Sequence, residues 1–359
     1  MNELARLIAQ RIALTGPISL ADFMAEALGH PRLGYYRKAA PLGAAGDFTT
    51  APEISQMFGE LLGAWLAERW QAMGSPASVN LVELGPGRGM LMADALRATR
   101  SVPGFHAALK LHLIDINEQL RVYQANALAA HAPTWHERFD DVPAGPLLLI
   151  ANEFFDALPV RQFHKTAAGW RERMVGLSDG VLGLALAPGP TPFAPVLPDG
   201  DTGAEAELSQ AAAALAGAIG ARVAEAGWAL IVDYGRDETR LGTSLHAVRD
   251  HRRADILDLP GETDLSAHVD FSLLAAAARG SGAATFGPVG QGEFLRRLGI
   301  ERRAAALKAR AGPEQAGEID AALERLIAAD QMGTLFRVLA LGDEKSDPPA
   351  GFAGFSDQR

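Results

Sequence analysis

The sequence contains no cysteine, and this absence removes three kinds of chemistry. Disulfide frameworks, thiolate metal sites and cysteine nucleophiles all need that residue. Long apolar runs are missing as well, because no stretch approaches the roughly 18 uninterrupted apolar residues of a membrane span. The N-terminus also lacks the apolar core of a signal peptide. We therefore expect no membrane span and a cytoplasmic location.

Positive charge is scarce. The chain has 33 Lys and Arg against 43 Asp and Glu, a formal net charge of −10. Because a nucleic-acid footprint needs clustered cations, we expect no nucleic-acid partner. A local basic patch at Arg249, Arg252 and Arg253 is either a solvated face or an insertion that contacts substrate. His268 and Asp270 have no partner at metal-ligand spacing, so we predict no metal site.

The rest of the sequence has a helical beginning followed by an α/β pattern. Residues 1–75 show helical spacing, and residues 76–342 alternate short apolar strands with helices, which predicts a parallel sheet covered on both faces. Residues 160–200 interrupt this pattern with an antiparallel hairpin and a proline-rich loop. Residues 236–280 are polar and irregular, and residues 343–359 are typical of a mobile tail.

Three glycines follow the first apolar strand, in "VELGPGRGM" at residues 82–90. A tight turn without a ligand is one interpretation, but backbone N–H groups at such a strand-to-helix turn commonly face a ligand. A dinucleotide fingerprint would have glycine where Met90 stands, and no Gly-Lys-Ser/Thr follows to make a P-loop. The spacing is instead similar to motif I of class I S-adenosylmethionine (SAM) methyltransferases, and the cofactor candidates are Glu83, Gly85, Pro86, Gly87 and Gly89.

Acidic residues follow the next two strands. Asp115 ends "LKLHLID", and a carboxylate there can accept hydrogen bonds from both vicinal hydroxyls of a ribose. Its alternative is to cap the helix that follows. Asp140 or Asp141, after the third strand, is the candidate for the adenine amino group, and a plain turn is the alternative there.

A second polar cluster follows the most apolar strand, in "IANEFFDALPVRQF" at residues 150–163. The carboxyl end of this strand should lie beside the cofactor's methyl group. Asn152, Glu153 and Asp156 could hold a guanidinium there, since carboxylates pair with it in bidentate fashion. The alternative is that Asn and Asp cap a short helix.

Seven blocks run in order from about residue 46 to residue 342: "GDFTTAPEISQMFGEL", "VELGPGRG", "ANEFFDALPVRQF", "IVDYG", "DLSAHVDF", "QGEFLRRLGI" and "GTLFRVLALG". Together they resemble the MidA-type methyltransferases, a family that includes the mitochondrial assembly factor 7 of respiratory complex I. The resemblance implies a class I SAM-methyltransferase Rossmann-like sheet, with an N-terminal helical lid and insertions in the second half. It also implies methylation of an arginine on a complex I subunit during assembly.

The resemblance also gives roles to single residues. Many members have Glu-Pro-Ser where this chain has Asp-Ile-Asn at 115–117, which preserves the acid. The implied groups are SAM contacts at Glu83, Gly85, Pro86, Gly87, Gly89, Asp115 and Asp140, an acceptor site at Asn152, Glu153 and Asp156, and a lid and substrate site at Asp47, Thr50, Glu53 and His268.

Two other functions stay open at this point. A methyltransferase-like assembly chaperone would bind SAM and a partner protein with weak turnover, and would keep the same glycine loop. A NAD-linked dehydrogenase is disfavoured by Met90. We expect a protein substrate, and we consider a homodimer among the oligomeric states.

Overall fold

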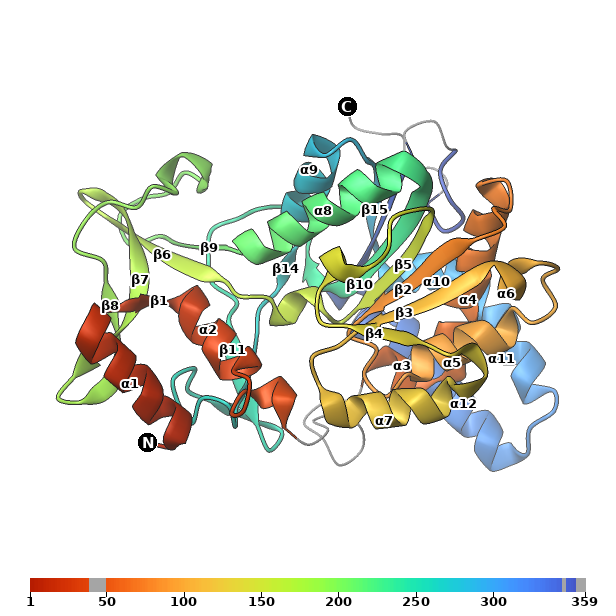
Figure 1. Cartoon of the computed structure of the whole chain (residues 1–359), viewed down its shortest axis with the longest axis horizontal. Helices are drawn as coiled ribbons and strands as arrows, with labels where there is room; N and C mark the ends of the chain where they lie inside the picture. Colours follow the sequence, from red (N-terminus) through yellow and green to blue (C-terminus); the bar gives the residue numbers. More distant parts are fainter. Residues whose placement is uncertain (39–49, 344–346, 353–359) are drawn as a thin grey trace.

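The computed structural model describes residues 1–38, 50–343 and 347–352, and its centre is an eight-stranded sheet (Figure 1). The seven strands of its main path are β2 (Val79–Leu84), β3 (Leu109–Ile114), β4 (Thr134–His136), β5 (Leu147–Asn152), β10 (Gly227–Arg236), β15 (Ala284–Gly290) and β16 (Phe336–Gly342). Their order is β4-β3-β2-β5-β10-β16-β15, and the short β14 (Val269–Asp270) pairs with β10. The strands from β4 to β10 are parallel, and β16 is antiparallel to both neighbours. This confirms the predicted α/β class.

Both faces of the main sheet are covered, which is why its central strands are almost continuously apolar. One face packs under α4 (Gln56–Ala72), α5 (Met90–Ala98), α10 (Gln291–Leu298), α11 (Ile300–Lys308) and α12 (Pro313–Ile327). The other face packs under α8 (Gln210–Ala226) and α9 (Phe271–Gly280). Side chains of β10 alternate between the two cores, with Leu230 in one and Ile231 in the other, as the period of two along a strand requires.

The strand order reverses between β2 and β5. From β2 the chain moves outward to β3 and β4, then returns to β5 and continues to β10 on the other side. In open α/β sheets this switch point leaves a crevice beyond the carboxyl ends of the strands, where ligands bind. The glycine loop follows β2 and the polar cluster follows β5, so the fold brings both to this crevice.

A second sheet lies beside the main one, on the left in Figure 1. Its strands are β1 (Ile18–Ser19), β6 (Arg161–Thr166), β7 (Gly169–Ser178), β8 (Val181–Leu186) and β9 (Glu205–Leu208). The predicted hairpin is confirmed, because β6 and β7 pair in antiparallel fashion.

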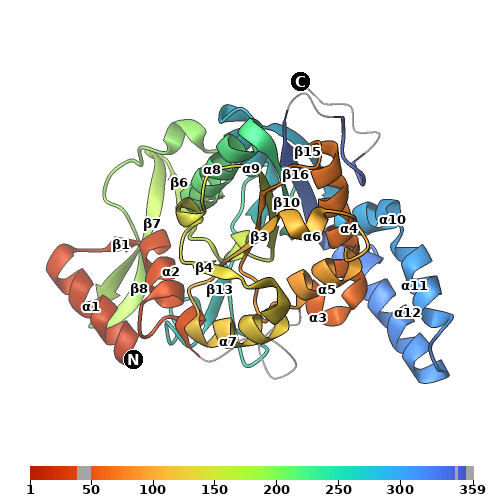
Figure 2. The same cartoon turned by 45° about the vertical axis from the view of Figure 1, so that its right-hand side comes forward.

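The N-terminal helices pack on this second sheet (Figure 2). The helices are α1 (Glu3–Thr15) and α2 (Leu20–Gly29), and β1 between them pairs with β7. A small third sheet of β11 (His246–Arg249), β12 (Arg252–Ala254) and β13 (Asp264–Ser266) joins the same apolar core through Ala247 and Leu265. The N-terminus and both insertions are therefore built together, although they are far apart in sequence.

Two helical regions are divided by short breaks. Residues 51–72 form two helices, α3 (Ala51–Ile54) and α4, because Ser55 has extended backbone and its hydroxyl accepts a hydrogen bond from the Met57 amide at 3.2 Å. Residues 291–327 form the three helices α10, α11 and α12. Gly299 has φ of 93°, in the left-handed region, and separates α10 from α11.

The C-terminal segment also differs from a mobile tail over residues 349–352. Phe352 is fully buried and its ring lies 5.3 Å from that of Phe294, centroid to centroid. The Trp65 indole donates a hydrogen bond to the Ala350 carbonyl at 3.1 Å. The predicted boundary at residue 75, between the N-terminal helical segment and the α/β core, stays a prediction.

Two absences hold for the part of the chain that the structure describes. No helix there is both long and apolar enough to cross a membrane. No group of three or more His, Asp and Glu side chains there is placed to hold a metal ion.

Candidate functional site

Two cavities adjoin at the crevice beside β2 and β5. The first cavity has a volume of about 380 Å³ and is lined by the glycine loop and by residues that follow β3 and β5. The second cavity, of about 930 Å³, lies toward β10, β11 and β13. Tyr36, Thr50 and Glu153 line both. The two spaces therefore meet at these three side chains.

The backbone of the glycine loop adopts a conformation that is costly for any residue with a side chain. Gly85, Gly87 and Gly89 have φ of 62°, 51° and 82°, in the left-handed region that costs other L-residues about 1–2 kcal/mol. A Cβ on Gly85 would also come within 2.8 Å of the Phe154 ring. Glycine at these positions therefore lets the loop turn tightly and lets Phe154 lie against it.

Asp115 is held in place by a buried glutamine. Gln124 of α7 (Glu118–Ala127) donates from Nε2 to Asp115 Oδ2 at 2.6 Å and to the Gly87 carbonyl at 2.8 Å. The Asn117 amide donates to Asp115 Oδ1 at 2.8 Å. Burial raises the pKa of Asp115, and these two donors oppose that rise. Each carboxylate oxygen has a further lone pair that a ligand hydroxyl could use.

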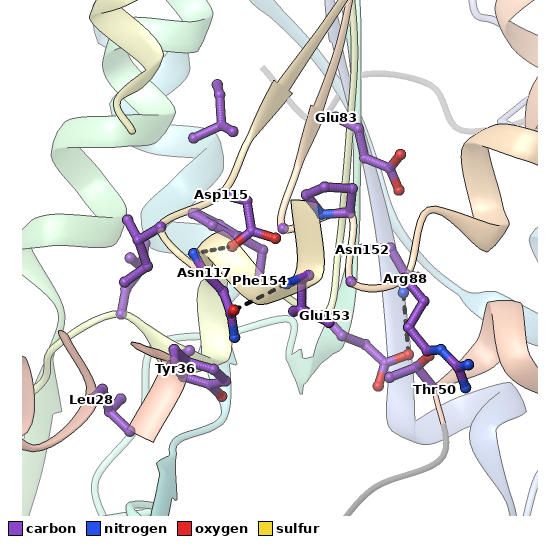
Figure 3. A pocket seen from close by; sticks show the side chains of 18 of the residues that line it. Leu28, Tyr36, Thr50, Glu83, Arg88, Asp115, Asn117, Asn152, Glu153 and Phe154 are labelled. Atoms are coloured by element: carbon purple, nitrogen blue, oxygen red, sulfur yellow. Dashed lines mark hydrogen bonds between the residues drawn. The ribbon is translucent and has the colours of Figure 1, made fainter. Parts of the chain in front are cut away.

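The capping alternative for Asp115 is wrong. The N-cap of α7 is Asn117, whose Oδ1 accepts from the amides of Gln119 and Leu120 at 2.9 and 3.1 Å. Asp115 therefore does not cap α7, and it faces the first cavity, as Figure 3 shows.

Glu83 stands in the wall of the first cavity without a full set of partners. It is buried in β2, and its Oε2 has no hydrogen-bond partner among the described residues. Burial, with the nearby Asp115 charge, raises the pKa of Glu83 to about 8. A buried carboxyl of this kind is costly unless a donor or cation meets it, so this wall suits a positively charged ligand.

Glu153 begins the polar turn after β5, on the opposite side of the first cavity from Asp115 (Figure 3). Its φ is 51°, a strained value for a non-glycine residue and one that clusters at functional sites. Its Oε1 accepts from the Ala51 amide at 3.0 Å and from Asn152 Nδ2 at 3.2 Å. Burial raises the pKa of Glu153 to about 7, helped by Asp156 and Glu53.

Asp233 stabilises this turn by accepting hydrogen bonds from its backbone. It is fully buried in β10, and its Oδ2 accepts from the amides of Phe154, Phe155 and Asp156 at 3.1, 2.9 and 3.3 Å. Burial raises the pKa of Asp233, and the charges of Asp156 and Glu153 raise it further. Asp233 lies in the block "IVDYG" but was not among the predicted site residues, although an acid inside an otherwise apolar strand is a usable signal.

Asp156 faces the second cavity. It lies in the short helix η4 (Phe155–Ala157) and receives a hydrogen bond from the Tyr234 side chain. Burial raises the pKa of Asp156 to about 6. Since Glu153 also lines the second cavity, the two carboxylates border the same space.

Of the other predicted site residues, three line a cavity and one lies outside the described residues. Thr50 lines both cavities and Glu53 lines the first, with its Oε2 lacking a hydrogen-bond partner among the described residues. His268 lines the second cavity, with its ring 5.4 Å from that of Tyr234. Asp47 lies outside the described residues.

The structure does not bring Asp140 to either cavity. Asp140 lies in η3 (Phe139–Asp141), its side chain is 70% exposed, and it pairs with Arg138 at 3.5 Å. Asp141 is exposed as well. Strand β4 ends at His136, so Glu137 is the first residue beyond it and lines the first cavity. Asp140 comes one turn too late in the chain to reach it.

Sequence reasoning missed several other lining residues. Arg88 lies within the glycine loop, and Tyr36 comes from the N-terminal segment and donates to Asp264 Oδ1 at 2.9 Å. Phe154 lines the first cavity between the two polar groups. Arg88 and Phe154 lie inside motifs that were recognised, whereas no local pattern marks Tyr36.

Known relatives support a methyltransferase. A family model described as "Putative S-adenosyl-L-methionine-dependent methyltransferase" matches residues 61–289. The human protein named protein arginine methyltransferase NDUFAF7, mitochondrial, is 36% identical over 95% of this chain and 83% of its own length. Its Drosophila melanogaster homologue is 37% identical over 95% of this chain and 85% of its own length.

A solved structure is similar over nearly the whole chain. It is a superfamily member from Burkholderia thailandensis bound to S-adenosyl-homocysteine, with a TM-score of 0.86 and 29% identity, covering 99% of this chain and 95% of that one. This similarity confirms the predicted class I SAM-methyltransferase fold.

The relatives correct the predicted cytoplasmic location. The human and zebrafish proteins are named as mitochondrial, so the prediction is contradicted. The reasoning failed because a missing signal peptide and a missing span do not separate one aqueous compartment from another.

The first cavity fits SAM on its own chemistry. SAM carries a ribose and two cationic centres, a sulfonium and an ammonium. Asp115 offers carboxylate oxygens for hydroxyls, and Glu83 Oε2 and Asn152 Oδ1 are buried acceptors without a partner in the described part of the chain. The family match, the relatives and this fit confirm SAM as the predicted cofactor, and the chain belongs to the family of SAM-dependent methyltransferases.

Proposed function

We propose that the chain methylates an arginine side chain of a protein partner, with the first cavity holding SAM and the second admitting the acceptor. The single observation that carries this proposal is Glu153, which lines both cavities and has a strained backbone. The relatives named protein arginine methyltransferases support the choice of arginine.

The residues proposed to hold SAM surround the first cavity. Asp115 would bind the ribose hydroxyls, and Glu83 would face a cationic centre. The loop backbone at Gly85, Pro86, Gly87 and Gly89 would lie against the ligand. When bound, SAM supplies an activated methyl group on its sulfonium. The chain therefore needs to orient an acceptor rather than create a leaving group.

Glu153 and Asp156 are the proposed acceptor residues. Their carboxylates border one space, and together they would pair with a guanidinium and hold one nitrogen toward the first cavity. Asn152 donates to Glu153 at 3.2 Å and so fixes its orientation. Asp233 positions both, because three amides of the same turn bond to it.

Proton transfer is the second role of Glu153. Methylation forms a C–N bond and breaks the C–S bond, and the attacking nitrogen must lose a proton. Burial raises the pKa of Glu153 to about 7, which suits a group that accepts a proton near neutral pH. Glu153 Oε would take the proton from nitrogen and pass it to solvent through the second cavity.

The proposed partner is a subunit of respiratory complex I, which the resemblance to complex I assembly factor 7 supports. The proposal includes a homodimer. Its support is β8, an edge strand that pairs with β7 and exposes Val181, Leu184 and Leu186. Light scattering after gel filtration would test the dimer, and Leu184→Lys should shift a dimer toward monomer.

The test of the function uses SAM with a deuterated methyl group. The purified protein is incubated with this SAM and with extracts from cells that lack the gene. Mass spectrometry should find the label on arginine of a complex I subunit, and Glu153→Gln should abolish it. Label on lysine or on a carboxylate would contradict the proposed acceptor. Saturable SAM binding without any label would favour the chaperone alternative.

A further inference from the structure

The wall of the second cavity contains both acidic and basic side chains. The acids are Glu153, Asp156 and Asp264, and Tyr36 donates to Asp264. The cations in the wall belong to elements far apart in the chain and are Arg236, Arg240, Arg253 and Arg325. A chain with net charge −10 therefore places four arginines in the wall of one cavity.

Three of these arginines are exposed, and their side chains have no partner among the described residues. The side chains of Arg240, Arg253 and Arg325 are exposed and form no hydrogen bond or ion pair with the residues that the structure describes. They come from the loop after β10, from β12 and from α12. Of the basic patch noted in the sequence, Arg253 thus lines the cavity.

Arg236 is different, because it is buried and incompletely paired. Its side chain is 9% exposed, and its Nε has no hydrogen-bond partner among the described residues. Its ion pair with Asp270 is loose, at 3.8 Å. Asp270 already accepts from the hydroxyls of Thr239 and Ser272 at 2.6 Å each. A buried guanidinium in this state would gain from an anionic ligand.

We propose that the arginines in the wall of the second cavity bind an acidic side chain, Asp or Glu, that lies close to the acceptor arginine in the substrate protein. This inference rests on the proposed function and adds the substrate's charge pattern to it. Tyr234, which bonds Asp156, and Arg236 lie two residues apart on β10 and so share one face of the strand. Their separation along the strand is about 7 Å. The acidic residue therefore lies about two positions from the arginine in an extended peptide.

The test uses a synthetic peptide library with one fixed arginine and randomised neighbours. The protein loaded with S-adenosyl-homocysteine captures peptides, and the protein with SAM methylates them. Both readouts are sequenced by mass spectrometry. We expect Asp and Glu near the arginine to be favoured over Asn and Gln by up to about fivefold, the upper end of the range for an exposed ion pair.

The variants separate this charge effect from folding. Arg240→Gln with Arg325→Gln should reduce the acidic preference without abolishing it, because Arg236 and Arg253 remain, and arginine should still be methylated. Arg138→Gln with Arg302→Gln is the matched control, because both side chains are exposed and line neither cavity. This control should keep the preference.

The outcomes are distinguishable. Arginine methylation without acidic preference would overturn this inference and leave the proposed function intact. Acidic preference in capture with no methylation would contradict the proposed function and support the charge pattern. Neither capture preference nor methylation would overturn both.

Discussion

The first and second cavities meet at Glu153 but are built in different ways. The first is walled largely by loop residues that directly follow β2, β3 and β5. The second is walled by side chains from β10, the third sheet and α12, which are brought together only by the fold. The first cavity combines a strained loop backbone with the carboxylates of Asp115 and Glu83, whereas the second is formed by charged side chains from distant segments. Substitutions should therefore affect the two cavities separately.

The largest expected effect is on the first cavity, from Gly87→Val. The backbone φ of 51° is costly for a β-branched residue, and the new side chain would occupy cavity space. We expect SAM binding, followed by isothermal titration, to be abolished while the circular dichroism spectrum stays native.

Gly180→Val is the matched control for this strain. Gly180 has φ of 78°, lies between β7 and β8, and an added Cβ would meet no atom within 4 Å. It should lose about 1–2 kcal/mol of unfolding free energy and still bind SAM. Wild-type SAM affinity in Gly87→Val would refute the loop assignment.

Asp115→Ala should weaken SAM binding by about 1–3 kcal/mol, the range for charge-assisted hydrogen bonds. Titration with NADH gives the control, since neither protein should bind it. Saturable NADH binding by the wild type would revive the dehydrogenase interpretation.

Asp233→Asn should affect the second cavity and spare the first. An amide in place of the carboxylate weakens three bonds to the turn and turns N–H groups toward backbone donors. We expect the free energy of unfolding to fall by about 2 kcal/mol and methylation to slow. SAM affinity should remain, and its loss would show that the turn supports both cavities.

A further expected effect on the first cavity concerns pH. The pKa of Glu83 is raised to about 8, so the ligand-free carboxyl is protonated at neutral pH. A cationic ligand binds the ionised form, and SAM affinity should therefore rise by up to about tenfold per pH unit between about pH 6 and pH 7.5. Glu83→Gln should remove this pH dependence. Dividing the SAM affinity of the wild type by that of the variant at each pH cancels the contribution from titration of SAM itself. An equal slope in both proteins would exclude Glu83.

The contrast between the cavities also explains what the sequence could predict. Motifs such as "VELGPGRG" and "ANEFFDALPV" are continuous, and they identified the strands, the crevice and Glu153. Asp140 was misplaced because strand ends shift by a residue or two, and the exact end of β4 decides which side chain reaches the cavity. Tyr36 and Arg325 could not be found, because they reach the cavities only through the packing of distant segments. Gln124 was hidden as one polar residue on a helix, although it joins Gly87 to Asp115.

The central claim is that Glu153 serves methyl transfer and not SAM binding. Glu153→Gln keeps the shape of the side chain and removes its charge, so single-turnover methylation of an arginine substrate, measured beside SAM affinity, tests the claim directly. The account predicts SAM affinity within about twofold of wild type and a methylation rate lowered by about 100-fold or more, the scale of a lost acid–base group. Unchanged methylation, or loss of SAM binding, would contradict it.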